Sequence, residues 1–572
     1  MIKLTWHKLT LLSSSISFLL VSYALFIVSM NPATGYELSI YTSTPYIFWV
    51  AIIIGLFNGI LILFLKMYGK IEKMWIIGIF SIILFNVLVI SLYAFRGYIL
   101  YLGRGDTAGY VGMAKDVNDY GYILNYNFYP LTSILISQIS QIINVSIVNI
   151  SKYLPSLFFG IYILSIYCWS KSLYNNKKFI IASVIVSAPI LFPWFSTSIY
   201  HMLLSVLTIP FLFYCINKSS ESSFKFLAII WVVLYPFFHP ITAMIVFLYI
   251  SIMYIYGTFV SHKPKPVSIF LVLVALVSLL RWFVSQYSIL HNVKLIILQM
   301  LNSTHSVSTA TQVEYYIQKL GFDAVLKSFL IVNANQVIFY VLAIISIVYI
   351  FRIKKINNTR FTPIILNFLI CSVFIIIIFF TSTTHNADRL INLNINMILT
   401  VPLIGYLLCK SSFKIQAIIL FLIMIASVTA IFSVYQSPFI TYPNDQMTNN
   451  DIVSMKWFLS EKSVKIKTVD ILNPTIRYGD IILGYDAASK RNDIHRDIVN
   501  LPDHFNLSKD NLFPIDQDRY LSITKYDIVA YTEIWKKIHR FENSDFVNLN
   551  SIKNVNRIYD NNENLFYLIN KK

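Results

Sequence analysis

Long apolar segments dominate this sequence, and they constrain the fold more than any other feature. A helix needs about 20 apolar residues to cross the hydrocarbon core of a bilayer. Of the 572 residues, 57% are hydrophobic and 13% charged, whereas soluble domains average about 45–50% and about 25%. The sequence therefore predicts an α-helical polytopic membrane protein embedded in a lipid bilayer. It excludes a soluble enzyme, a nucleic-acid binder and a secreted module. The thirteen candidate spans lie near 9–30, 46–65, 74–95, 152–169, 179–193, 200–216, 224–238, 240–259, 267–285, 335–351, 361–380, 390–409 and 414–435.

The loops between these segments predict the orientation of the chain. Its formal net charge is +18. With a cytoplasmic N-terminus, every alternate loop is basic, and these loops and the N-terminus together hold 18 Lys and Arg against two acidic residues. The positive charge is therefore mostly a topology signal, and thirteen spans place the C-terminus outside a plasma membrane. The basic loops contain Lys66, Lys70 and Lys73; Lys171, Lys177 and Lys178; Lys218 and Lys225; Lys263 and Lys265; Arg352, Lys354, Lys355 and Arg360; and Lys410 and Lys414.

Two segments need a choice between alternatives. The first apolar run follows Lys3 and Lys8 as a signal peptide would, but its roughly 22 residues exceed the usual 7–15, which favours a span. The segment 131–147 is rich in Ser, Gln, Thr and Asn, so we predict an interfacial helix instead of a span. The membrane domain then covers 1–435, with a large outer loop at 96–151 and a second at 286–334.

The tail, residues 436–572, differs sharply in composition. It holds 18 basic and 18 acidic residues and no cysteine. Helix-like and strand-like pieces alternate along it, and the end of the tail has two alternating apolar runs around an Asn-rich turn, which predicts a β-hairpin. We expect a small extracytoplasmic α/β domain. The four cysteines all lie in apolar runs, which predicts packing residues and not a disulfide framework.

The first outer loop carries the strongest candidates for chemistry. Asp106 follows Gly-Arg-Gly, where the backbone can bend and present a carboxylate just above the membrane. A helix is expected from Ala108 to Asp119, ended by Gly121, with Asp116 and Asp119 on one face. Lys115 and Asp116 could equally be a solvated pair on that face. Arg104, Tyr110 and Asp116 are candidate substrate-binding residues.

Other candidates lie at the expected outer ends of spans. Arg389, at the mouth of the twelfth span, could bind a phosphate, or it could extend to the lipid headgroups. Arg281 invites the same two interpretations. His239 and His385 are substrate-binding candidates, although His239 and His201 also suit hydrogen-bonded packing positions. The ten histidines form no zinc motif.

These features resemble the GT-C superfamily of integral membrane glycosyltransferases. That superfamily includes oligosaccharyltransferase catalytic subunits, protein O-mannosyltransferases and lipid A aminoarabinose transferases. The resemblance lies in Asp106 early in a long outer loop, a helix ending in glycine, and Phe128-Tyr129-Pro130 before a non-spanning helix. The segment from Asp388-Arg389-Leu390 to Met397 and Pro402 is similar to the outer-loop arginine and following span of oligosaccharyltransferases.

The resemblance implies a polyprenyl-phosphate-linked sugar donor and a glycan, lipid or protein acceptor on the outer face. Asp106 would act as general base or as ligand of a divalent cation, Mg or Mn, and Arg389 would hold the donor phosphate. The chain departs from the family in three places. The tail lacks Trp-Trp-Asp-Tyr-Gly, the outer segment 193–200 has no carboxylate, and Thr107 replaces a second acid after Asp106. A metal-independent transferase of single sugars of the cell envelope fits these departures better, and metal use stays open.

Two other functions compete with this one. A transporter or flippase of a lipid-linked or small polar substrate would have inverted repeats and broken helices at mid-membrane. The sequence has no internal repeat. A GT-C-like scaffold without activity is the third possibility. Both alternatives predict that Asp106 is dispensable for sugar transfer.

Overall fold

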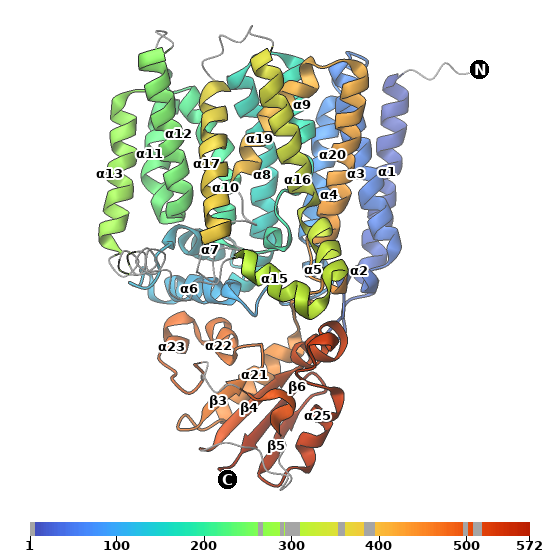
Figure 1. Cartoon of the computed structure of the whole chain (residues 1–572), viewed down its shortest axis with the longest axis vertical. Coiled ribbons are helices and arrows are strands. Elements are labelled where there is room, and N and C mark those ends of the chain that lie inside the picture. The colour runs from blue at the N-terminus through green and yellow to red at the C-terminus, as the bar shows by residue number, and fades with distance from the viewer. Residues whose placement is uncertain are drawn as a thin grey trace, which may run out of the picture.

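A helical bundle and a smaller domain beneath it make up the chain (Figure 1). The structure is a computed structural model, and it describes residues 6–260, 267–286, 309–352, 361–381, 395–495, 501–506 and 517–571, with His291 and Lys294. Each of the thirteen candidate spans overlaps one helix of the bundle. These are α1 (Trp6–Met30), α3 (Tyr46–Met67), α4 (Trp75–Ile90), α8 (Ile147–Leu173), α9 (Lys177–Val186), α10 (His201–Asn217), α11 (Ser222–Phe238), α12 (Pro240–Ile255), α13 (Ile269–Ser285), α16 (Phe322–Arg352), α17 (Phe361–Thr381), α19 (Asn396–Lys410) and α20 (Phe413–Ser433).

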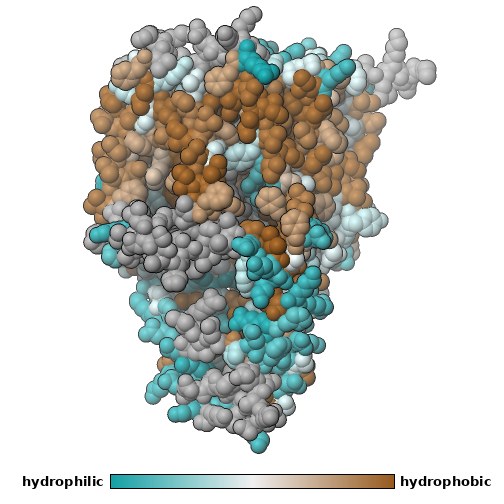
Figure 2. Space-filling view, viewed as in Figure 1, coloured by the Kyte–Doolittle hydropathy of each residue, from teal (hydrophilic) through white to brown (hydrophobic). Residues whose placement is uncertain are grey.

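Six helices in the described part of the chain are long and apolar enough to cross a membrane: α1, α3, α8, α12 with its π-helical extension, α16 and α20. Large apolar side chains are exposed on the outer surface of the bundle, for example Leu19 and Phe26 on α1 and Ile344 on α16. Figure 2 shows this surface as a hydrophobic belt above a hydrophilic C-terminal domain. Such a belt is stable only against lipid, because large exposed apolar patches are rare in water. The chain is a membrane protein, and thirteen spans and their orientation stay predictions.

The candidate span 179–193 differs from the sequence prediction. Its helix, α9, has ten residues and therefore measures about 15 Å, half the thickness of a bilayer core. The chain then continues through the bundle as a buried, largely non-helical segment to Tyr200. Pro189 explains the break, because it has no backbone N–H and cannot continue a helix.

Neighbouring helices satisfy the backbone of this broken segment. The Asn86 side chain on α4 donates to the carbonyl of Ala188 at 2.9 Å, and Asn335 on α16 donates to the carbonyl of Ile190 at 3.0 Å. Backbone groups at membrane depth need such partners where the helix is interrupted. The two asparagines, one before this segment in the sequence and one after it, therefore stabilise its irregular backbone.

Two helices lie across the end of the bundle that faces the C-terminal domain (Figure 1). They are α6 (Asp106–Tyr120) and α7 (Pro130–Ile143), both from the first outer loop. The predicted helix ending in Gly121 is present, and Gly121 caps it with φ of +76°. The predicted non-spanning helix is α7. The second outer loop differs: α15 (Thr309–Leu320) lies within it, and α16 begins at Phe322, so that the predicted boundary at 334 falls inside a helix.

The C-terminal domain contains a four-stranded mixed sheet with the order β3-β4-β6-β5. Strand β3 runs parallel to β4, and β4–β6 and β6–β5 are antiparallel. The predicted hairpin is β5 with β6. The strands are β3 (Lys467–Asp470), β4 (Arg519–Thr524), β5 (Val555–Asp560) and β6 (Asn564–Ile569), and the helices are α21 (Asn449–Glu461), α22 (Thr475–Leu483), α23 (Tyr485–Ser489), α24 (Lys525–Val529) and α25 (Asn543–Asn548).

The domain is packed against the bundle by both backbone and side chains. Strand β1 (Leu100–Tyr101), in the first outer loop, pairs antiparallel with β2 (Gln446–Met447) at the start of the tail. The apolar core of the bundle continues into the domain through Phe458 of α21 and Phe566 of β6. This docking sets α22 and α23 beside α6, where Asp106 lies.

Candidate functional site

Asp106 is the first residue of α6, at the end of the bundle that faces the C-terminal domain. The preceding loop turns sharply, with Leu102 at φ of +54° and Gly105 as the N-cap. A carboxylate at this position is favourable, because the unpaired amides at a helix N-terminus carry partial positive charge. The Asp106 side chain is 24% exposed, so it is open to a reactant.

An arginine of the C-terminal domain holds this carboxylate. Arg477 on α22 places Nη2 2.9 Å from Oδ1 of Asp106 and Nη1 3.3 Å from Oδ2 of Asp480. The two contacts fix the guanidinium between one partly exposed and one buried carboxylate. The membrane domain and the tail therefore contribute to the same charged cluster.

Two glycines let α22 approach α6 closely. A Cβ on Gly109 would lie 3.1 Å from Nη1 of Arg477, and one on Gly112 would lie 2.6 Å from the carbonyl oxygen of Asp480. A side chain at either position would push the two helices apart. The glycines thus bring Arg477 within reach of Asp106.

Two carboxylates beside this cluster have raised pKa values. Burial raises the pKa of Asp480 to about 7, and the nearby carboxylates of Asp116 and Asp106 add to the rise while Arg477 opposes it. Burial also raises the pKa of Asp116, which accepts hydrogen bonds from the Tyr126 hydroxyl and, at 2.8 Å, from the backbone N–H of Asp486.

The contacts of Lys115 and Asp116 argue against a solvated pair. The Lys115 ammonium donates to the carbonyl of Ile482 at 2.6 Å, and Asp116 is 4% exposed. The two residues are therefore not a solvated pair, because each contacts the C-terminal domain. Asp119 is exposed whereas Asp116 is buried, so the two carboxylates do not form a pair on one helix face.

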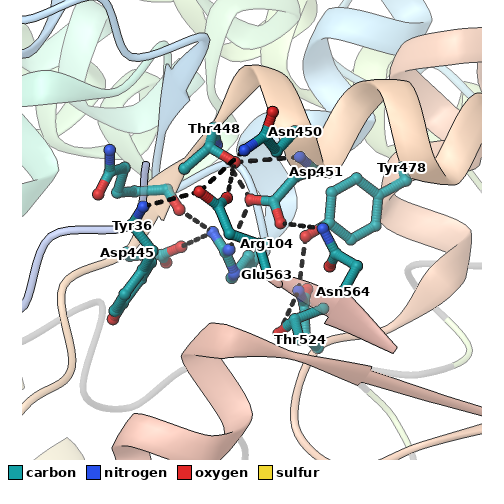
Figure 3. Close-up of polar contacts among 12 residues, drawn as sticks. Tyr36, Arg104, Asp445, Thr448, Asn450, Asp451, Tyr478, Thr524, Glu563 and Asn564 are labelled. Carbon is teal, nitrogen blue, oxygen red and sulfur yellow. Dashed lines mark hydrogen bonds and ion pairs between the residues drawn. The ribbon is translucent and has the colours of Figure 1, made fainter. Parts of the chain in front are cut away.

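Arg104 lies in a buried polar network and not on an open surface (Figure 3). Its guanidinium pairs with Asp451 at 2.8 Å and with Asp445 at 3.8 Å, and it lies over the ring of Tyr526. Around it, Glu563 accepts hydrogen bonds from Thr448 and from the backbone N–H of Tyr36. Arg104 thus fastens the first outer loop to the tail, a placement that favours a structural role over substrate binding.

Tyr110, one turn after Asp106, belongs to an aromatic–histidine cluster made of Tyr110, Tyr129, His201, His239 and Trp282. The ring centroids of Tyr110 and His201 lie 4.1 Å apart, and Tyr129 lies 5.5 Å from His201 and 5.3 Å from His239. Trp282 stacks on Tyr129 at 6.1 Å. The cluster joins α6 to the ends of α10, α12 and α13, and His239 belongs to it through its contact with Tyr129.

Of the two predicted phosphate-binding residues, one lies in the described part of the chain. Arg281 lies on α13 with an exposed side chain. Arg389 and His385 lie outside the described residues.

The described residues do not fit a resident divalent cation. No group of three or more His, Cys, Asp or Glu side chains among them could hold a metal ion. The positive guanidinium of Arg477 occupies one side of the Asp106 carboxylate.

Sequence reasoning missed Arg477 and Asp480. They lie in an unremarkable stretch of the tail, 371 residues after Asp106 in the case of Arg477. Their i,i+3 spacing predicts only a shared helix face. The glycine pair at 109 and 112 marks a close helix contact, but it does not identify the partner.

Comparison with known proteins gives neither a family match nor a curated protein that matches the sequence. Among solved structures, the apo oligosaccharyltransferase of Archaeoglobus fulgidus has a TM-score of 0.48 and 11% identity, over 87% of this chain and 74% of that one. The same enzyme tethered to an acceptor peptide with the NVT sequon has a TM-score of 0.47 and 11% identity, over 82% and 70%. Its complex with an inhibitory peptide and a dolichol-phosphate has a TM-score of 0.46 and 11% identity, over 82% and 71%. All three are structures of one archaeal oligosaccharyltransferase.

Proposed function

We propose that this chain is a membrane glycosyltransferase of GT-C type. It would move a sugar from a polyprenyl-phosphate-linked donor to an acceptor at the membrane face that carries the C-terminal domain. The observation that carries the proposal is the pairing of Asp106 with Arg477 at 2.9 Å. The pairing supports the proposal because it orients a partly exposed carboxylate at the end of the bundle that faces the tail, where a lipid-linked donor and a water-soluble acceptor would meet.

In this mechanism Asp106 is the general base. Its carboxylate takes the proton of an acceptor hydroxyl while that oxygen bonds to the anomeric carbon of the sugar. The bond between that carbon and the phosphate oxygen breaks, and its electron pair leaves with the polyprenyl phosphate. Arg389, and Arg281 as a second candidate, would stabilise the negative charge that grows on this phosphate. Arg477 positions the base, because its contact with Asp480 fixes the guanidinium that pairs with the Asp106 carboxylate.

A transporter or flippase is the second candidate, and one observation favours it. The chain has a broken helix after α9, with backbone carbonyls held by Asn86 and Asn335. Interrupted helices of this kind form substrate sites in transporters. The sequence shows no inverted repeat, however, and the charged groups gather at the end of the bundle instead of its middle.

Substitution of Asp106 tests the proposal. The full chain is reconstituted in lipid vesicles with a panel of polyprenyl-phosphate monosaccharides, and release of polyprenyl phosphate is measured. We expect Asp106→Asn to lower the rate by about 10²–10⁴-fold. Asp119→Asn, on the exposed face of the same helix, is the control and should keep the wild-type rate. A full rate in Asp106→Asn would reject the assignment, and lipid translocation without transfer in both variants would favour the flippase.

A further inference from the structure

His201 in the aromatic–histidine cluster is a buried polar group that the proposed chemistry at Asp106 does not use. Its side chain is at the start of α10, and the residue is 2% exposed. Within the described structure, neither ring nitrogen, Nδ1 or Nε2, has a hydrogen-bond partner. Leaving a buried donor and acceptor unpaired is costly, and native proteins rarely retain such groups without a reason.

The surroundings of His201 limit what could satisfy it. Tyr110 and Tyr129 contact its ring, and His239 and Trp282 also pack against Tyr129. The five members of the cluster include no lysine, arginine or carboxylate. A neutral imidazole offers one donor and one acceptor, which matches a hydroxyl group and not a phosphate.

The cluster also lies next to the proposed base. Tyr110 follows Asp106 by four residues, so both side chains lie on one face of α6. On the other side, the Thr107 and Ser198 hydroxyls lie 2.6 Å apart, which joins the first turn of α6 to the segment that leads into His201. A molecule held by the cluster would therefore lie about one helical turn from the Asp106 carboxylate.

We propose that the aromatic–histidine cluster binds the sugar ring of the donor and that His201 hydrogen-bonds its hydroxyls. A pyranose ring has an apolar C–H face that packs on aromatic rings and an edge of hydroxyls that donate and accept. Mostly apolar linings with a few placed polar groups are typical of small-molecule sites. The proposal rests on the proposed function, since it names a part of the same site that recognises the sugar and not the phosphate.

Two substitutions separate binding from packing. His201→Phe keeps the ring and removes both hydrogen-bonding atoms, whereas His201→Gln keeps a donor and an acceptor. In the absence of ligand, His201→Phe should unfold at the wild-type temperature or above it, because it removes an unpaired buried group. Tyr162→Phe is the matched control, since the Tyr162 hydroxyl is also buried without a partner, on α8.

The experiment measures binding of bare polyprenyl phosphate and of polyprenyl-phosphate monosaccharides to the full chain in detergent, by thermal shift. We expect the wild type to bind at least one sugar-bearing lipid about tenfold more tightly than the bare lipid. His201→Phe should lose this preference and keep its affinity for bare polyprenyl phosphate. His201→Gln should keep part of the preference, and Tyr162→Phe all of it.

The possible outcomes are distinct. A preference that survives His201→Phe would overturn the inference, and a lowered unfolding temperature in the same variant would show His201 to be a packing residue. A wild type that binds both lipids equally would also overturn it, while the proposed function stands. A wild type that binds neither lipid would overturn the proposed function and this inference together.

Discussion

The Asp106 carboxylate lies 2.9 Å from the guanidinium of Arg477, although 371 residues separate them in the sequence. Asp106 begins a helix of the first outer loop, and Arg477 belongs to a short helix of the C-terminal domain. The same guanidinium reaches Asp480 at 3.3 Å. The candidate site is therefore shared by the two domains, and the docking of the tail is part of its construction.

Arg477 should be needed for activity more than for folding. We expect Arg477→Gln to lower sugar transfer by about 10²-fold, since a small displacement of a catalytic group has an effect of this size. Arg477→Lys keeps the charge but not the forked contact, so it should fall between Arg477→Gln and the wild type. Transfer rates and thermal unfolding are measured on the same reconstituted samples.

Arg557→Gln provides the control for this series, because Arg557 is exposed on β5 and pairs with Asp560 at 3.0 Å, within the same strand. It should leave both rate and unfolding temperature unchanged. An Arg477→Gln variant with the wild-type rate would show that Arg477 does not position the base.

Asp480 should make the stability of the protein depend on pH. Burial raises its pKa from the ordinary 3.8 to about 7, so between these values the folded state holds a proton that the unfolded state has lost. Stability therefore falls as pH rises from about 4 to about 7, by at most about 1.4 kcal/mol per pH unit. Asp480→Asn carries no charge at any pH and should reduce this slope, with the largest gain over the wild type near pH 8.

Unfolding temperatures between pH 4 and pH 8 measure the slope. Part of it should persist in Asp480→Asn, because burial raises the pKa of Asp445 and of Asp527 to about 6 and these act in the same direction. Asp119→Asn, on the exposed face of α6, should keep the full wild-type slope. An unchanged slope in Asp480→Asn would show that the pKa of Asp480 in the wild type lies near the ordinary value.

The sequence predicts the elements better than their contacts. Apolar segment length locates each bundle helix, and Gly121 marks the end of α6, because both signals are local. The break after α9 was missed, since an apolar run that includes Pro189 has the composition of a span whether it is helical or not. Strand β4 was also missed, although it is central in the sheet.

In the candidate site, too, the sequence predicts residues with a local signal better than contacts between distant segments. Asp106 stands out because a carboxylate beside a span is unusual, and that signal lies in one short stretch of sequence. Arg477 and Asp480 acquire their meaning from the packing of α22 on α6, which no local pattern reveals. Arg104 was expected to bind substrate, and the structure instead buries it against Asp451.

The contact between α6 and α22 requires a glycine at position 112. A methyl group there would lie 2.6 Å from the backbone carbonyl oxygen of Asp480, which cannot move aside as a side chain can. We expect Gly112→Ala to cost about 1–3 kcal/mol, as other overpacked contacts do, and to lower transfer because Arg477 moves away from Asp106. Thermal unfolding and protease resistance of the tail are measured.

Gly160→Ala is the matched control for this substitution. It lies inside α8, where the nearest atom to an added methyl group is Cγ2 of Ile83 at an ordinary 3.5 Å. Alanine should be neutral or slightly stabilising there, because it restricts the unfolded chain more than glycine does. Equal effects of the two substitutions would argue against a specific requirement at position 112.

Arg104 should hold the C-terminal domain in place. Its guanidinium is buried between Asp451 and Asp445, so Arg104→Met leaves two buried carboxylates without their cation (Figure 3). Breaking a buried pair in this way costs about 3–5 kcal/mol. We expect the variant to expose the tail to protease while the bundle stays folded, and to lose transfer because Arg477 leaves with the tail. Lys490→Met removes an exposed partner of Asp486 on α23 and should change neither readout. Protease resistance equal to the wild type in Arg104→Met would show that the apolar contacts of Phe458 and Phe566 suffice for docking.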